Sequence, residues 1–144
     1  MDPEHKRGIA ETGIQEWINA GTIEYLGTTD DVRGYIEEAD CIVLPSYREG
    51  TPRTLLEAAS SAKPIIATDV PGCNHVVRNN FNGLLCKLKD ANDLAEKMLQ
   101  MASLEDETLK VFGQNGPARM ESEYDESVVI NKYLSALDNF KKAS

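Results

Sequence analysis

The stretch from Leu44 to Thr68 constrains the fold of this chain more than any other part of it. An apolar run stops at Pro45, a polar loop follows, and a run of helix-forming residues then leads to a second apolar run at residues 65–67. This order predicts a strand, a loop, a helix and a second strand, which is the repeating unit of a parallel sheet. The loop is therefore expected at the carboxyl end of a strand, against the amino end of a helix.

The amino end of that predicted helix has the features of an anion-binding site. Pro52 suits the first helical position, where its fixed φ and its missing N–H cost nothing. Free N–H groups and the positive end of the helix dipole favour phosphate there, and open α/β sheets bind their ligands at this edge. Two carboxylates, Glu49 and Glu57, flank the position eight residues apart.

Composition limits the classes of function. The 144 residues suffice for one domain with a core, and the 41% hydrophobic share is ordinary for a globular protein. A formal net charge of −9 argues against nucleic acid and anionic lipid as partners. Neither a membrane span nor a secretory signal is visible. Cys41, Cys73 and Cys86 are too far apart for a zinc site and indicate a reducing, cytoplasmic compartment.

Helical and strand patterns alternate along the chain. The predicted strands are residues 22–26, 41–44, 65–67 and 84–86. The predicted helices are residues 2–21, 30–38, the run after Pro52, one turn near 76–77, a helix capped by Asp90 or Asn92, and residues 105–112, 117–123 and 125–141. This alternation indicates a doubly wound, Rossmann-like α/β sheet with helices on both faces. The apolar strand 41–44 is expected to be covered on both faces. The terminal helix carries the stripe Val129, Tyr133, Leu137 and Phe140.

Several motifs between residues 25 and 87 resemble those of a known family. They are Tyr25-Leu26-Gly27, Glu49-Gly50-Thr51-Pro52, Lys63-Pro64-Ile65-Ile66-Ala67-Thr68, Pro71-Gly72-Cys73 and Asn82-Gly83-Leu84-Leu85. In this order and spacing they resemble the C-terminal, donor-binding domain of family-four retaining glycosyltransferases, which have the GT-B fold. Glu49 and Glu57 match the glutamate pair that is this family's signature.

The resemblance implies a site and a reaction. A nucleotide diphosphate sugar, with UDP the favoured carrier, would give its sugar to an acceptor hydroxyl with retention of the anomeric configuration and without a metal cofactor. Glu49 would contact the transferred sugar, either as a catalytic residue or only to orient it, and Glu57 would bind the ribose hydroxyls. The residues assigned to the donor are Glu49, Gly50, Thr51, Pro52, Arg53, Thr54 and Glu57.

The resemblance also implies what the chain would work with. Residues 1–144 would be a donor domain without its first strands and without the acceptor domain, and would be inactive alone. The acceptor would be a saccharide or lipid-linked saccharide in bacterial surface polysaccharide or lipopolysaccharide synthesis. The enzyme would be cytoplasmic, or peripheral at the membrane through the missing domain. A homodimer through a sheet edge or the terminal helix is a further expectation.

Three other interpretations are open at this point. A receiver-like signalling module has a similar sheet, but it needs acidic residues after its strands where Pro45 and Ser46 follow Leu44. A sugar-nucleotide epimerase shares the GT-B architecture, but with a serine- and glycine-rich central loop. Alternatively, Glu57 is only an exposed helical residue paired with Arg53, four positions earlier.

Overall fold

The computed structural model describes residues 11–125, 127–128, 130–132 and 134–135. The chain divides into two units, Met1–Asp30 and Asp31–Ser144. In the first unit, α1 (Glu11–Asn19) is followed by Gly21 with a φ of +68°. The N–H groups of Gly21 and Thr22 donate to carbonyls of the last turn, which confirms the predicted helix end at Gly21. The predicted start at residue 2 lies outside the described residues.

The predicted strand at residues 22–26 is wrong. Residues 23–29 are irregular, and Ile23, Tyr25 and Leu26 are 40–54% exposed. A strand is stable only when it hydrogen-bonds to a neighbouring strand, and no strand among residues 11–30 supplies one. The apolar pattern of this segment is therefore not sufficient to make it a strand.

The second unit is built on a sheet of three parallel strands, β1 (Ile42–Leu44), β2 (Ile65–Thr68) and β3 (Gly83–Cys86), in the order β1-β2-β3. Ile66 of the central strand lies opposite Val43 on one side and Leu84 on the other. Because the strands are parallel, the loops 45–52, 69–72 and 87–90 all follow strand ends at the same edge of the sheet.

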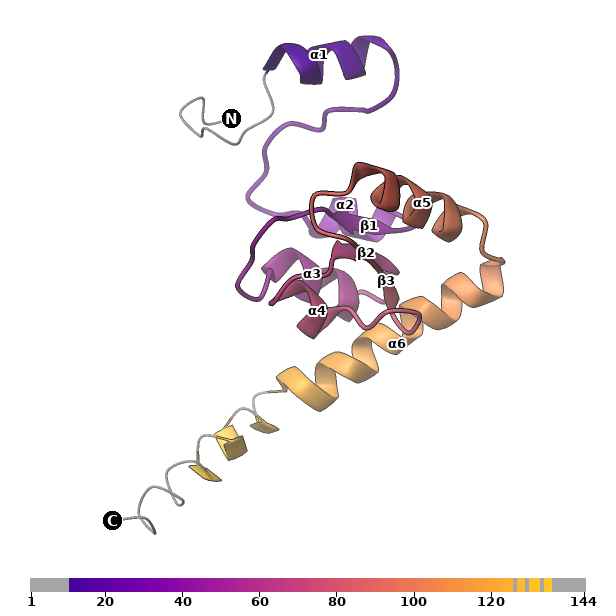
Figure 1. The fold of residues 1–144 in the computed structure, drawn as a ribbon. Helices are drawn as coiled ribbons and strands as arrows, with labels where there is room; N and C mark the ends of the chain where they lie inside the picture. Colours follow the sequence, from indigo (N-terminus) through magenta and orange to yellow (C-terminus); the bar gives the residue numbers. More distant parts are fainter. Residues whose placement is uncertain (1–10, 126, 129, 133, 136–144) are drawn as a thin grey trace. The chain divides into compact units, whose positions relative to one another are not determined.

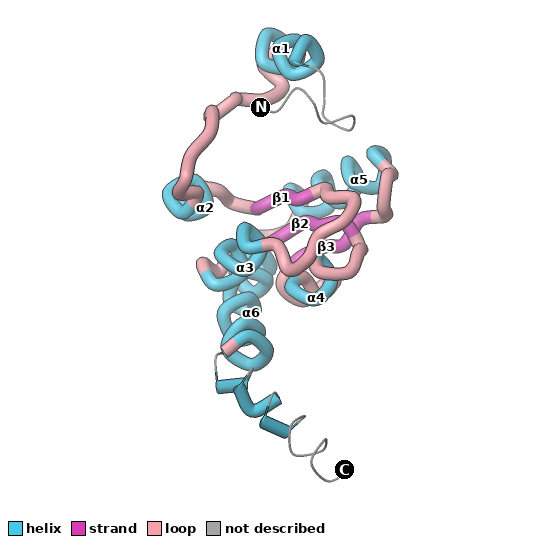
Figure 2. Tube along the Cα trace, turned by 90° about the vertical axis from the view of Figure 1, so that its left-hand side faces the viewer, coloured by secondary structure: helices cyan, strands magenta, loops and turns pink. Residues whose placement is uncertain are grey.

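Helices cover both faces of this sheet, which confirms the predicted α/β class (Figures 1 and 2). On one face lies α5 (Ala91–Ala102), and its N-cap Asp90 accepts a hydrogen bond from Asp93 N at 2.9 Å. On the other face lie α3 (Arg53–Ser60), α4 (Cys73–Val76) and α6 (Asp106–Tyr124). The short helix α2 (Arg33–Glu38) packs on α3 through the buried Ile36.

The core has two parts, one on each face. Ile65 and Ala67 of β2 point into the part shared with α3, α4 and α6, while Ile66 points into the part shared with Met101 of α5. This alternation is what a fully buried parallel strand requires. The expectation that β1 is covered on both faces is wrong in part, since Val43 is 36% exposed. β1 is one of the two outer strands of the described sheet and receives less cover than the central strand β2.

The helix α6 differs from the prediction of two helices at residues 105–112 and 117–123. It runs unbroken from Asp106 to Tyr124, with Pro117 inside it. Its backbone touches α3: a β-carbon at Gly113 would lie 2.2 Å from the carbonyl oxygen of Ala62, and one at Gly116 would lie 2.4 Å from that of Ala59. Close packing on α3 outweighs the missing N–H of proline, so tertiary contacts override the local signal. The terminal stripe from Val129 to Phe140 lies outside the described residues.

Candidate functional site

The loop 45–52 leads from the end of β1 into α3. Pro52 is the N-cap of α3 rather than its first residue as predicted, with φ −67° and ψ 121°. Its carbonyl accepts the first helical hydrogen bonds, from Leu55 N at 3.1 Å and Leu56 N at 3.2 Å. The proline φ suits either position, so ψ decides the boundary, and the sequence does not fix ψ.

The amino end of α3 is open. Within the described part of the chain, no side chain or carbonyl accepts a hydrogen bond from the N–H groups of Arg53 or Thr54. Gly50 and Thr51 are exposed just ahead of them, whereas Pro52 is buried. A helix end with unpaired N–H groups and a positive dipole favours an anion. The predicted seat for a diphosphate is therefore not filled by the protein's own groups.

Glu49 is held by a neighbouring hydroxyl. Ser46 Oγ donates to Glu49 Oε1 at 2.7 Å, and the carboxylate is half-buried. Its negative charge is also felt by Cys73: burial raises the pKa of that thiol, and the proximity of Glu49 raises it further. Glu49 therefore has a defined position against α4. The sequence motif contained Ser46, but nothing in the pattern assigned it this role.

The backbone carbonyl groups of Glu49 and Gly50 rest directly on the turn before α4. A β-carbon at Gly72 would lie 1.5 Å from the carbonyl oxygen of Gly50 and 2.7 Å from that of Glu49. Gly72 also has a φ of +93°, which L side chains rarely adopt. Both observations require glycine here. In the sequence, Pro71-Gly72-Cys73 stood out only as one of the family motifs, so this contact was missed.

Glu57 lies on α3 and is engaged with Arg53. Arg53 Nε donates to Glu57 Oε1 at 2.9 Å, and the side chains are 90% and 25% exposed, respectively. The pair considered from sequence is thus present. No hydrogen bond or ion pair in the described chain joins Glu57 to Glu49. Because so exposed a pair is weak, a ligand can displace the arginine at little cost.

A second loop reaches the first at this edge of the sheet. The Lys89 Nζ lies 5.5 Å from the centre of the Tyr47 ring, so the loop after β3 meets the loop after β1. Tyr47 is 55% exposed, and Arg48 and Arg53 are exposed as well. Basic side chains therefore gather here on a chain of net charge −9. No sequence signal pointed to Lys89.

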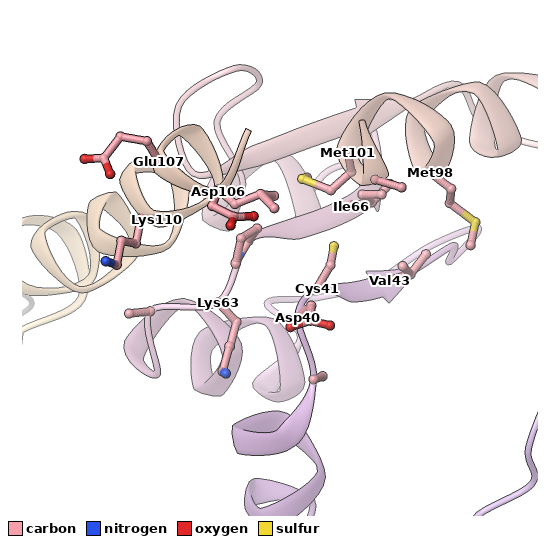
Figure 3. Close-up of a pocket in the computed structure, with 15 residues that line it drawn as sticks. Asp40, Cys41, Val43, Lys63, Ile66, Met98, Met101, Asp106, Glu107 and Lys110 are labelled. Atoms are coloured by element: carbon pink, nitrogen blue, oxygen red, sulfur yellow. The ribbon is translucent and has the colours of Figure 1, made fainter. Parts of the chain in front are cut away.

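A groove of about 920 Å³ lies elsewhere, between β1 and α5. Figure 3 shows Cys41 and Val43 on one side of it and Met98 and Met101 on the other, with Asp40, Lys63 and Lys110 among its charged residues. None of the residues assigned to the donor lines it. Burial raises the pKa of the Cys41 thiol to about 11, so this thiol is not a reactive nucleophile at neutral pH.

The loop 45–52 and the open amino end of α3 lie at the carboxyl edge of a parallel sheet, where open α/β folds bind their ligands. Residues 10–119 match the family described as glycosyl transferases group 1. The chain belongs to this family, which confirms the resemblance drawn from its motifs and removes the receiver-like alternative.

Relatives of known description agree with this assignment. The chain is 37% identical over 127 residues to the N,N'-diacetylbacillosaminyl-diphospho-undecaprenol alpha-1,3-N-acetylgalactosaminyltransferase of Campylobacter jejuni, covering 88% of this chain and 33% of that enzyme. It is 32% identical over 90 residues to the UDP-Gal:alpha-D-GlcNAc-diphosphoundecaprenol alpha-1,3-galactosyltransferase of Escherichia coli, covering 62% of this chain and 23% of that enzyme. The chain thus spans about a third or less of the length of these relatives.

The fold is that of solved GT-B glycosyltransferases. Sucrose-phosphate synthase from Thermosynechococcus elongatus superimposes with a TM-score of 0.76 at 25% identity, over 93% of this chain and 34% of that one. Among the described residues, no helix is both long enough and apolar enough to cross a bilayer.

Proposed function

We propose that this chain is the donor-binding part of a retaining glycosyltransferase that moves a hexosyl group from a UDP-sugar to a hydroxyl of a lipid-linked saccharide. The open amino end of α3, with Glu49 held beside it by Ser46, carries the proposal. Uridine diphosphate is favoured because the Escherichia coli relative is named for UDP-galactose. The lipid-linked acceptor follows from the undecaprenol-linked substrates named for both relatives.

The proposed roles of the site residues follow the order of the chemical groups along the donor. The diphosphate lies at the amino end of α3, where the N–H groups of Arg53 and Thr54 have no partner in the described protein. The exposed backbone of Gly50 and Thr51 completes this cradle. Charge builds up on the diphosphate as the glycosidic bond breaks, and N–H dipoles that are already in place stabilise it without reorganisation.

The two carboxylates hold the two sugars. Glu57 lies about a turn and a half beyond Pro52, which is roughly 7 Å along the axis at 1.5 Å per residue. We assign it to the ribose diol, as a two-oxygen acceptor, with Arg53 moving from Glu57 to the diphosphate. Glu49 faces the transferred sugar, and whether it takes part in the chemistry or only orients the sugar is decided by the variants below.

We propose that the acceptor-binding site and the rest of the donor site are supplied by a longer protein. An N-terminal domain would bind the lipid-linked saccharide at the cytoplasmic face of the membrane, in surface polysaccharide synthesis. Residues 1–144 alone are then expected to bind the donor weakly and not to turn over. The reaction is proposed to need no divalent metal, and activity that persists in excess EDTA is the expected result.

The test is calorimetry on the full-length protein with UDP, GDP and ADP. We expect UDP to bind best, and Glu57→Ala to weaken UDP about 10- to 100-fold through the loss of charge-assisted hydrogen bonds. Glu96→Ala, at an exposed position of α5 on the opposite face, is the control and should leave affinity unchanged. The proposal fails if none of the nucleotides binds, or if Glu57→Ala binds UDP like the parent.

A second set of variants separates the roles of the carboxylates. Glu49→Ala is expected to keep UDP affinity and to lower kcat about 100-fold or more, because it removes the group that contacts the transferred sugar. Glu49→Gln keeps the size and the hydrogen-bonding capacity of the side chain and removes only its charge. If Glu49→Gln retains most of the activity, Glu49 only orients the donor. Proton NMR of the product gives the anomeric configuration. A free-nucleotide epimerisation assay covers the epimerase alternative.

A further inference from the structure

The position of the backbone at Glu49 and Gly50 is set by α4. Gly72, the N-cap of this helix, leaves no space between its α-carbon and the carbonyl oxygens of Glu49 and Gly50. A shift of α4 toward the loop would therefore produce a steric clash, and a shift away would remove the contact that supports these two carbonyl groups. The placement of Glu49 thus depends on what fixes α4.

The helix α4 is too short to fix itself. It has four residues, far fewer than an isolated helix needs for stability. At its amino end, Asn74 N donates to Val70 O at 3.0 Å and Asn74 Nδ2 donates to Asp69 Oδ1 at 2.9 Å. These bonds tie the helix to the segment after β2, and its buried Cys73 and Val76 pack into the core.

At its carboxyl end, α4 is held by the buried Asn82, whose Nδ2 donates to Val76 O at 3.1 Å, and by Arg119 from α6. Arg119 Nη2 donates to His75 O at 2.6 Å, and Nε donates to Val76 O at 3.1 Å. These are carbonyls of the last turn, which have no acceptor role inside so short a helix. The side chain is only 14% exposed, and its third nitrogen pairs with Glu123 at 3.0 Å. A planar, charged fork that bonds two carbonyls fixes orientation as well as distance.

The same helix supports the other side of the site. Through Gly113 and Gly116, α6 touches the backbone at the end of α3, and α3 carries Glu57 and the open N–H groups. The helix α6 therefore fixes the positions of both α3 and α4. Arg119 donates to carbonyl groups of α4, which supports the loop that carries Glu49. None of its hydrogen bonds in the described chain reaches α3, which carries Glu57.

We propose that Arg119 is a positioning residue that acts through α4 and Gly72 to place Glu49 and the Gly50 backbone for the transferred sugar. This inference rests on the proposed function for the role of Glu49. It predicts different effects on sugar transfer and on UDP binding, because the nucleotide half of the donor contacts α3 and not α4. Loss of Arg119 should impair sugar transfer while leaving UDP affinity intact.

The test compares three variants of the full-length enzyme. Arg119→Met is expected to lower kcat about 10- to 100-fold, since small misplacements of reacting groups cost this much, with UDP affinity within about twofold of the parent. Arg119→Lys, which keeps the charge and one donor group, should recover part of kcat. Glu123→Gln removes only the outer ion pair and should keep kcat within about threefold.

Amide hydrogen exchange supplies a readout that needs no substrate. Arg119→Met should speed exchange at Glu49, Gly50 and residues 73–77, and leave Leu55 and Leu56 of α3 protected as in the parent. This result would stand even if UDP failed to bind, so a failure of the proposed function is distinguishable.

The inference is overturned if Arg119→Met keeps kcat, if it loses UDP affinity in the same proportion as kcat, or if exchange rises equally in α3. Arg119→Lys also guards against a folding failure of the methionine variant. If neither variant folds, Arg119 is a general stability residue and the proposal is wrong.

Discussion

The carbonyl oxygen of Gly50 faces the α-carbon of Gly72 at a distance that leaves no room for a side chain, since a β-carbon would lie 1.5 Å from that oxygen. A loop that carries a site residue is thus packed backbone to backbone against the turn that begins α4. Backbone contacts of this kind do not depend on side-chain rotamers. The position of the loop is therefore set by the backbone alone.

Because of this contact, we expect even the addition of a single methyl group at Gly72 to destabilise the protein strongly. Gly72→Ala should lower the free energy of unfolding by at least about 2 kcal/mol, through the clash and the positive φ together. Gly34→Ala is the matched control, because a β-carbon at Gly34, inside α2, meets nothing within 4 Å. It should be neutral or stabilise by about 0.5–1 kcal/mol. Urea titrations measure both, and equal effects would contradict the contact.

The two long helices differ in how they begin, and this predicts a contrast. Asp90 caps α5 through its side chain, whereas Glu105, the N-cap of α6, makes no side-chain cap bond. Asp90→Ala should therefore destabilise the protein by about 1 kcal/mol, and Glu105→Ala should change stability by less than about 0.5 kcal/mol. Thermal unfolding by circular dichroism compares them, and a larger loss at Glu105 would refute this account of the caps.

The ion pair between Arg53 and Glu57 is expected to matter for binding and not for folding. Arg53 is 90% exposed, so Arg53→Ala should change the free energy of unfolding by less than about 0.5 kcal/mol. Under the proposed function, the same variant should weaken UDP binding, because it removes a cation from beside the diphosphate. The first result is read by chemical denaturation and the second by calorimetry, and a stability loss above about 1 kcal/mol would show that the pair is structural.

The half-buried thiol of Cys41 gives a pH-dependent prediction. Burial disfavours the thiolate and raises the pKa from 9.0 to about 11, so the thiolate fraction, and with it the alkylation rate, should keep rising until about pH 11. At pH 8, Cys41 should react about 100-fold more slowly than a cysteine of ordinary pKa. Peptide-resolved mass spectrometry after iodoacetamide pulses measures this rate. A plateau near pH 9 would mean that the thiol is solvated.

Sequence patterns predicted the central unit well because its signals are local and agree with one another. The run at residues 65–67 is a strand buried on both sides, and the helix after Pro52 begins within one residue of its expected position. The segment 22–26 also carries apolar residues but has no neighbouring strand among residues 11–30. Strand formation depends on a partner that local sequence does not show.

The remaining misses also have long-range causes. Pro117 is a reliable local stop signal, yet α6 continues through it because Gly113 and Gly116 pack on α3. The motif located Glu49, Glu57 and the loop between them. Gly72, Lys89 and Arg119 lie 22 or more residues away from Glu49 in sequence and reach the site region only through the fold. No spacing rule connects such residues before the topology is known.

The close approach of α6 to α3 has a consequence for the design of shorter fragments of the protein. A chain cut ahead of Gly113 would leave the carbonyl groups of Ala59 and Ala62 facing solvent and would remove the surface against which α3 rests. The helix that presents the open amides would then be free to tilt. A minimal donor-binding fragment must consequently extend past Gly116, even though none of the residues assigned to the donor lies beyond Glu57.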